Sequence, residues 1–181
     1  MAKKILMGVG VVAVLLVATI AVLGAIAPTD LHVEREIVID RPKEVVFEDL
    51  KYMKNHDRWS PWFKRDPNLA KDYRGEDGTV GFVSSWSGND QVGVGEEEIK
   101  KIAEGERIDY ELRFKKPMED TSAAYLITEA VDGDKTKVKW GMVGKTPFPG
   151  NIICMLMNMR AMLARDFDEG LGMLKADLEK Q

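Results

Sequence analysis

The sequence has few of the side chains that most catalytic and metal sites use, with one cysteine and two histidines among 181 residues. Cys154 can form no internal disulfide, and it lies in an apolar stretch where a thiol stays protonated and unreactive. One cysteine and two histidines are too few for a His/Cys metal site, so no metal is expected. His32 and His56 belong to no credible Ser-His-Asp or Cys-His arrangement, and there is no glycine-rich phosphate loop, so we expect no cofactor.

An excess of basic charge is also lacking. Lys and Arg number 26 against 30 Asp and Glu, which gives a net charge of −4. No basic stripe with interleaved aromatic residues occurs along the chain. Nucleic acid is therefore not an expected partner.

A long uncharged run lies near the N-terminus. The 23 residues from Ile5 to Ala27 carry no charged side chain, and about 20 such residues span the hydrocarbon core of a bilayer. Lys3 and Lys4 precede this run, whereas mostly acidic residues follow it within ten positions. Because the positive flank of a membrane helix stays in the cytoplasm, we predict a single-pass protein whose remaining chain lies on the extracytoplasmic side.

A cleavable signal peptide is the competing interpretation of this run. Ala25-Ile26-Ala27 is typical of a signal-peptidase site. The apolar run exceeds the roughly 7–15 residues of a usual signal peptide, which favours an uncleaved anchor and leaves cleavage near Ala27, giving a secreted or periplasmic protein, as the alternative. In both cases residues 1–29 form the membrane segment and linker, and residues 30–181 form one domain.

The middle of the chain has the pattern of strands joined by short turns. Apolar runs and apolar/polar alternation between turn residues predict strands at 31–39, 69–74, 79–87, 91–103, 107–114, 121–131 and 135–143. Short turns between neighbouring strands require antiparallel pairing. Gly93 and Gly95 interrupt one strand, where a bulge would curve the sheet. A helical segment from Pro42 to about Lys54, with Asp40 as its N-cap, follows the first strand.

A long helix is predicted at the C-terminus. Apolar residues recur in steps of three and four from Ile152 to Leu178, which indicates one helix capped by Asn151. Its first half, to Leu163, is apolar nearly all round and rich in methionine. Such a half suits either a core helix covered on two sides or the wall of a pocket of variable content.

Three short motifs carry a family resemblance, namely Trp59-Ser60-Pro61-Trp62, Asp66-Pro67 and Val92-Gly93-Val94-Gly95. With this order of elements, the chain from Asp30 to Lys180 resembles the SRPBCC superfamily, the START/Bet v 1-like helix-grip group. Within that group it resembles bacterial polyketide cyclase/dehydrase-like proteins with an N-terminal membrane helix. The resemblance implies an α+β helix-grip fold, in which a curved antiparallel sheet of about seven strands wraps around the C-terminal helix. It also implies a deep cavity between sheet and helix, used for lipids, sterols, polyketides or other apolar molecules.

The side chains expected to line such a pocket come from the inward strand faces, the aromatic segment after the first helix, and the C-terminal helix. They are Trp59, Trp62, Phe63, Phe82, Trp86, Tyr110, Leu112, Tyr125, Trp140, Met142, Met155, Met159 and Met162. Each could equally belong to an ordinary core. The position of Tyr125 depends on a strand register that its apolar neighbours leave open.

Glu97 is the sharpest candidate for chemistry. If it points into the cavity, its apolar surroundings raise its pKa and allow it to act as a general acid or base, with Tyr110 as a second candidate. Alternatively, the run Glu96-Glu97-Glu98 faces water. Arg160 either meets a ligand carboxylate or phosphate, or reaches solvent.

Three functions follow from these patterns. The favoured one is a membrane-tethered binding module for a hydrophobic or amphipathic, lipid-like small molecule. The second is a cyclase- or dehydratase-type enzyme that transfers protons with a cavity carboxylate or tyrosine. The third is an envelope protein-interaction domain, which a packed interior with an exposed apolar patch would favour.

Overall fold

The computed structural model describes residues 2–180, with side chains from Leu6 onward. Lys3 and Lys4, on which the predicted orientation rests, lie outside the described side chains, and Gln181 lies outside the described residues. The elements are, in chain order, α1 (Ala2–Ile26), β1 (Asp30–Ile39), α2 (Lys43–Lys51), η1 (Met53–Arg58), α3 (Pro61–Arg65), β2 (Ala70–Arg74), β3 (Val83–Ser87), β4 (Val94–Ala103), β5 (Arg107–Lys116), β6 (Asp120–Val131), β7 (Lys135–Lys145), α4 (Gly150–Leu156) and α5 (Met159–Leu178).

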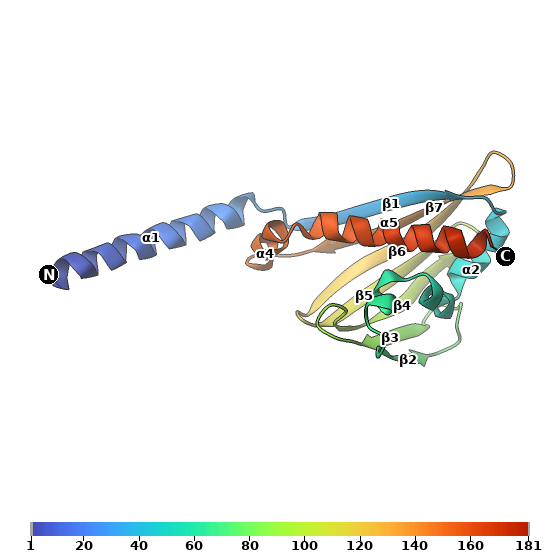
Figure 1. The fold of residues 1–181 in the computed structure, drawn as a ribbon, viewed down its shortest axis with the longest axis horizontal. Coiled ribbons are helices and arrows are strands. Elements are labelled where there is room, and N and C mark those ends of the chain that lie inside the picture. The colour runs from blue at the N-terminus through green and yellow to red at the C-terminus, as the bar shows by residue number, and fades with distance from the viewer. Residues whose placement is uncertain (1, 181) are drawn as a thin grey trace.

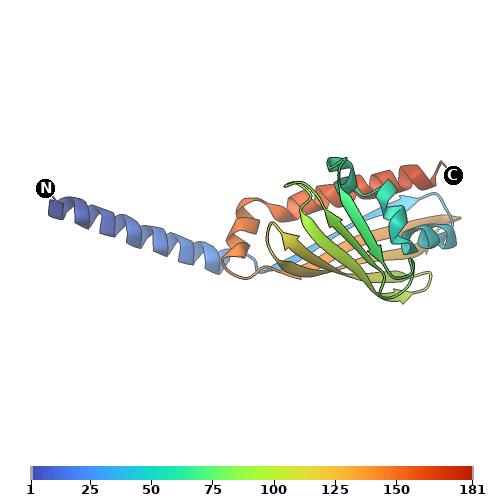
Figure 2. The ribbon, with the colours of Figure 1, turned by 90° about the horizontal axis from the view of Figure 1, so that it is seen from below.

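The seven strands form one antiparallel sheet in the order β1-β7-β6-β5-β4-β3-β2. Hairpins join consecutive strands from β2 to β7, and β1 pairs with β7 at one edge. The sheet curves, and α5 runs along its concave side while α1 projects away from the domain (Figures 1 and 2). The predicted α+β helix-grip fold is confirmed.

Five strands follow their predicted bounds to within two residues, whereas the other two begin later than predicted. The strands β3 and β4 start at Val83 and Val94, because glycines with positive φ precede each of them. Gly93 has φ +74°, and a Cβ there would lie 2.4 Å from the backbone oxygen of Lys116. The register between β4 and β5 shifts between Val94 and Gly95, as the glycines predict. It shifts again between Ile99 and Lys101, where the sequence has no glycine.

The single C-terminal helix of the prediction is wrong. The chain forms α4 and α5, separated at Asn158, whose φ of +52° is the left-handed conformation. Asparagine tolerates this conformation better than most side chains, so neither glycine nor proline is needed to break the helix. Asn151 is not an N-cap either, because it lies inside α4 and its side chain bonds to α1. Asp40 likewise does not cap α2, which begins after Pro42.

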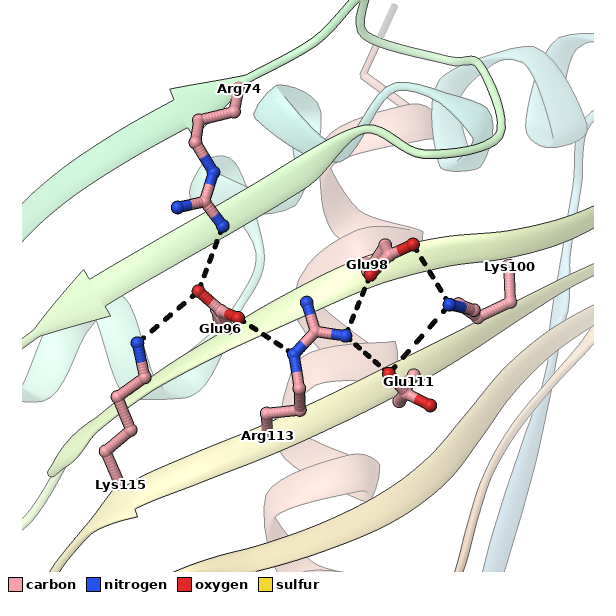
Figure 3. Close-up of polar contacts among 7 residues, drawn as sticks. All are labelled: Arg74, Glu96, Glu98, Lys100, Glu111, Arg113 and Lys115. Atoms are coloured by element: carbon pink, nitrogen blue, oxygen red, sulfur yellow. Dashed lines mark hydrogen bonds and ion pairs between the residues drawn. The ribbon is translucent and has the colours of Figure 1, made fainter.

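The outer face of the sheet carries a cluster of ion pairs on β2, β4 and β5 (Figure 3). Arg113 donates to Glu96 at 2.8 Å, to Glu98 at 2.8 Å and to Glu111. These hydrogen bonds hold the pKa of Glu96 and of Glu98 below the ordinary value. Because side chains alternate along a strand, fixing Glu96 and Glu98 outward turns Glu97 toward the concave face.

Candidate functional site

The concave face is tightly packed at the end that holds the C-terminus of α5. Side chains of the sheet, α2 and α5 form one buried cluster there, and most of them are 0–4% exposed. The cluster includes Ile39, Leu50, Trp59, Phe82, Ile99, Ile108, Tyr110, Leu126, Val138, Leu171, Leu174 and Leu178. This end has the packing of a conventional core.

The other end of the concave face, which lies toward α4, is less well covered. A smaller buried cluster of Val33, Met142, Ala164 and Phe167 is bordered there by half-buried apolar side chains. We call these bordering residues the open end; they are Leu31, Trp62, Trp86, Phe114 and Leu163. Trp86 lies edge-on to Phe114, with ring centroids 6.0 Å apart. The open end therefore presents aromatic and aliphatic surface that solvent or a ligand can reach.

Aromatic rings separate the two ends. The ring of Trp140 stacks on that of Phe167, with centroids 4.4 Å apart, and meets that of Trp59 edge-on, with centroids 5.2 Å apart. Trp62 meets Trp140 at 5.5 Å, so it covers the same ring from the side of the open end. Gly170 makes this arrangement possible, because a Cβ on that residue would lie 2.7 Å from the Trp140 ring.

Glu97 lies on the concave face. It lies on β4 between Ser84 of β3 and Leu112 of β5, and its residue surface remains partly accessible. Burial raises its pKa from 4.5 to about 7. Glu97 therefore titrates near neutral pH, and its protonated form can donate a hydrogen bond.

Tyr110 is a diagonal neighbour of Glu97, because Glu97 pairs with Leu112 and Tyr110 pairs with Ile99. The Cα atoms of such diagonal neighbours lie about 7–8 Å apart. The Tyr110 hydroxyl is buried and has no hydrogen-bond partner among residues 2–180. Burial first, and then the charge of Glu97, raise the pKa of Tyr110 well above its usual value.

The structure brings together many of the predicted pocket residues. Trp62 and Trp86 belong to the open end, and Met142 lies in the smaller buried cluster beside it. Trp140 borders both clusters, and Leu112 borders the tightly packed one, which contains Trp59, Phe82 and Tyr110. Met155 and Met159 are half-buried near the helix break, and Met162 is 46% exposed, so it does not line the interior.

Two predicted aromatic residues lie elsewhere. Tyr125 is on the outer face, where its hydroxyl donates to Glu34 and its ring covers Gly141. Phe63 belongs to neither buried cluster. Its ring centroid lies 3.7 Å from the Lys71 ammonium, and Lys71 pairs with Trp86, so Phe63 contacts the β2 edge of the concave side. Arg160 is exposed and donates to the backbone oxygen of Asp30.

The predicted set of pocket residues left out Leu31, Phe114 and Leu163, all of which belong to the open end. The alternation along 31–39 and the helical stripe through Leu163 contained the necessary signal. The sequence indicates the burial of Asn151 less clearly, because it shows only a single polar residue before an apolar run.

The deep cavity that the resemblance implied does not appear among the principal hollows of residues 2–180. One hollow is an open groove of about 690 Å³ on α2, lined by Val45, Glu48, Tyr52 and Leu178 among others. The second follows α1. Neither of these two hollows lies between the sheet and α5.

Fold and site together define a helix-grip protein whose concave face is sealed at one end and accessible at the other. Residues 30–179 match the model of the polyketide cyclase/dehydrase and lipid transport family, and the chain belongs to that family. No curated protein matches the sequence.

Solved structures of the same fold are similar to the chain at low identity. Protein MLL2253 from Mesorhizobium loti has a TM-score of 0.62 at 14% identity, covering 83% of this chain and 98% of its own. Ara h 8.0201 has a TM-score of 0.58 at 16% identity, covering 84% and 99%. The hypothetical protein jhp0584 from Helicobacter pylori has a TM-score of 0.60 at 14% identity, covering 82% and 88%. At these identities the likeness concerns the fold alone.

Proposed function

We propose that the protein is a membrane-tethered binding module for an apolar or amphipathic small molecule, which enters the concave face at the open end. The observation that carries this proposal is the unequal packing of the concave face. One end buries 16 residues to 0–4% exposure, whereas the other buries only four, to 2–7%, and leaves Trp62, Trp86 and Phe114 half-buried. A core that served only stability would gain by sealing both ends, because burying apolar surface is favourable.

The lining chemistry indicates the class of ligand. Aromatic and aliphatic side chains provide most of the open end, and Glu97 adds a carboxylate farther in. Ligand sites commonly combine a mostly apolar wall with few polar groups that fix orientation. A carboxyl group with a pKa near 7 can donate to or accept from a ligand hydroxyl or amide, which suits an amphipathic molecule with one polar end.

Ligand entry requires movement of side chains at the open end. Leu163 and Met159 lie on the first turns of α5, directly after the break at Asn158. Unbranched methionine adapts its shape readily. We propose that these side chains and Trp62 move aside when a ligand enters, so that the space forms on binding.

The tether is proposed from α1, whose residues Leu6–Ile26 are long and apolar enough to cross a membrane. Retention of this helix is favoured by Asn151, which is 0% exposed and donates to the backbone oxygens of Gly24 and Ala27. Cleavage near Ala27 would remove both acceptors of this amide. We therefore favour an uncleaved anchor over a signal peptide.

Photo-crosslinking can test the proposed binding site. The full chain in detergent would be mixed with a fatty acid that carries a diazirine near its methyl end, and the labelled peptides would be identified by mass spectrometry. Labelling is expected at Leu31, Phe114 and Leu163. Labelling confined to α1 or to the α2 groove beside Val45 would contradict the proposal.

A matched pair of variants on α5 sharpens this test. Leu163→Ser removes apolar surface from the open end, whereas Arg165→Ser alters an exposed position two residues away. Labelling at Phe114 should fall in the first variant and persist in the second. Thermal unfolding of both variants would show whether a loss of folding explains the difference.

A proton-transferring enzyme is the second candidate, and the position of Glu97 diagonally across from Tyr110 on the neighbouring strand favours it. Both groups have raised pKa values, and the Tyr110 hydroxyl has no partner among the described residues. Ligand co-purified with the chain would be incubated in deuterium oxide and inspected for deuterium bound to carbon. Incorporation that is lost in Glu97→Gln and kept in Glu98→Gln would support catalysis, whereas no incorporation in the unaltered protein would leave binding alone.

A further inference from the structure

Large apolar side chains are exposed where α4 meets α5. Leu156 is 70% exposed, Phe148 59%, Met157 53%, Met162 46% and Ile153 45%. Ile153 and Leu156 lie on one face of α4, and Met157, the residue after α4, continues that face because it lies four residues from Ile153. We call these five residues the α4 patch. Soluble surfaces rarely gather so many large apolar side chains, and such a patch marks a contact with a protein or a membrane.

The α4 patch is attached to the last turn of α1. Asn151 donates to the oxygens of Gly24 and Ala27, at 3.1 Å each. Phe148 lies so close to α1 that a Cβ on Gly24 would be 2.8 Å from its ring. Figure 1 shows α4 at the junction between α1 and the domain. The depth of α1 in a membrane therefore sets the depth of α4.

The length of α1 places this junction at the membrane surface. Leu6–Ile26 comprises 21 residues, which at 1.5 Å per residue extend about 32 Å, close to the roughly 30 Å of a hydrocarbon core. The last turn of α1 then lies near the boundary between acyl chains and head groups. Amphipathic segments bury their apolar faces about 5–10 Å into this boundary layer.

The charges of the segment favour lipid as the occupant. Residues 146–165 include no Asp or Glu, and their only charged residues are Arg160 and Arg165, both exposed. Cationic and apolar side chains together suit an interface that contains anionic head groups.

We propose that the α4 patch lies in the interfacial layer of the same bilayer that α1 spans, which holds the open end of the concave face toward the lipid. The inference rests on the proposed tether. Leu163 of the open end follows Met162 of the patch directly, so a molecule leaving the bilayer beside α4 would meet the open end first.

Site-directed fluorescence can test this position, because Cys154 is the chain's single cysteine. In a Cys154→Ala background, Leu156→Cys would carry an environment-sensitive fluorophore on the α4 patch. Val14→Cys would report the middle of α1, and Asp132→Cys would report the exposed β6–β7 turn. Each labelled full chain would be reconstituted in vesicles of phosphatidylcholine with a minority of phosphatidylglycerol.

Lipids with a nitroxide near the head group should quench position 156 and shift its emission to the blue. Lipids with a nitroxide deep in the acyl chain should quench position 14, and position 132 should respond only to aqueous iodide. Position 156 responding to iodide as strongly as position 132 would overturn the inference. Self-quenching between labelled chains at position 156, without quenching by lipid, would assign the patch to a second copy and also overturn it. If position 14 escapes lipid quenching, the tether itself fails, which distinguishes the two proposals.

Discussion

The side-chain amide of Asn151 donates a 3.1 Å hydrogen bond to the backbone oxygen of Ala27, across 124 residues of sequence. A second bond of 3.1 Å from the same nitrogen reaches Gly24. The last carbonyls of a helix have no partner within it, so these bonds satisfy the end of α1. The domain thereby fixes the end of the helix that precedes it.

Asn151→Ala should loosen this joint. The buried carbonyls of Gly24 and Ala27 would lose their partner, at a cost of about 1–3 kcal/mol in the free energy of unfolding. Hydrogen exchange should rise in α4 and in residues 24–30, with little change in β5 and β6. Asn68→Ala, at an exposed turn, is the matched control, and equal exchange in the two variants would contradict the role of Asn151.

Substitutions at Asn158 should separate backbone strain from side-chain contacts. Because its φ is +52°, glycine should be tolerated there, whereas alanine should destabilise the protein by about 1–2 kcal/mol relative to glycine. Urea unfolding of Asn158→Gly and Asn158→Ala measures the difference. Equal stability would mean that α4 and α5 can join without harm to the fold.

The buried carboxyl of Glu97 should give the protein a characteristic pH dependence. Its pKa is about 7 in the folded state against an ordinary 4.5, so the folded protein binds more protons between these values and stability falls as pH rises through this range. Across this pH range the free energy of unfolding should fall by up to roughly 3 kcal/mol, at 1.36 kcal/mol per pKa unit.

Glu97→Gln should abolish this fall, as measured by chemical unfolding across the pH range. Glu98→Gln is the control on the outer face, and it should keep the fall while removing the negative charge that accepts a hydrogen bond from Arg113. His56, whose pKa burial lowers to about 4, acts in the opposite direction in every variant, so the difference between the curves isolates Glu97. Identical curves for Glu97→Gln and the unaltered protein would place that side chain in water.

Two glycines of α5 should respond in opposite directions to alanine. A Cβ on Gly170 would lie 2.7 Å from the Trp140 ring and 3.1 Å from Pro61, whereas a Cβ on Gly172 would meet no atom within 4 Å. Gly170→Ala should therefore destabilise by about 1–3 kcal/mol. Gly172→Ala should stabilise by about 0.5–1 kcal/mol, since glycine disfavours the helix. Thermal unfolding compares the pair, and a loss of stability in Gly172→Ala would show a contact that the structure lacks.

Local patterns in the sequence predicted most of the fold. The alternation of apolar and polar residues along 107–114 and 135–143 predicts strands with one buried side. The apolar run that forms α1 is recognised from composition alone. Antiparallel pairing followed from the short turns. These features arise from neighbouring residues, so the sequence alone determined the strands, the apolar N-terminal helix and their order.

Contacts between distant segments decided the rest. Tyr125 has apolar neighbours on both sides in sequence, and it lies outward because Gly141 leaves room for its ring. Glu97 turns inward because Arg113, on the next strand, holds the glutamates on either side of it. The break at Asn158 accompanies the bonding of Asn151 to α1. Pattern fixes which elements form, but the face a residue presents depends on the space and hydrogen-bond partners that other strands and helices supply, and those exist only once the chain has folded.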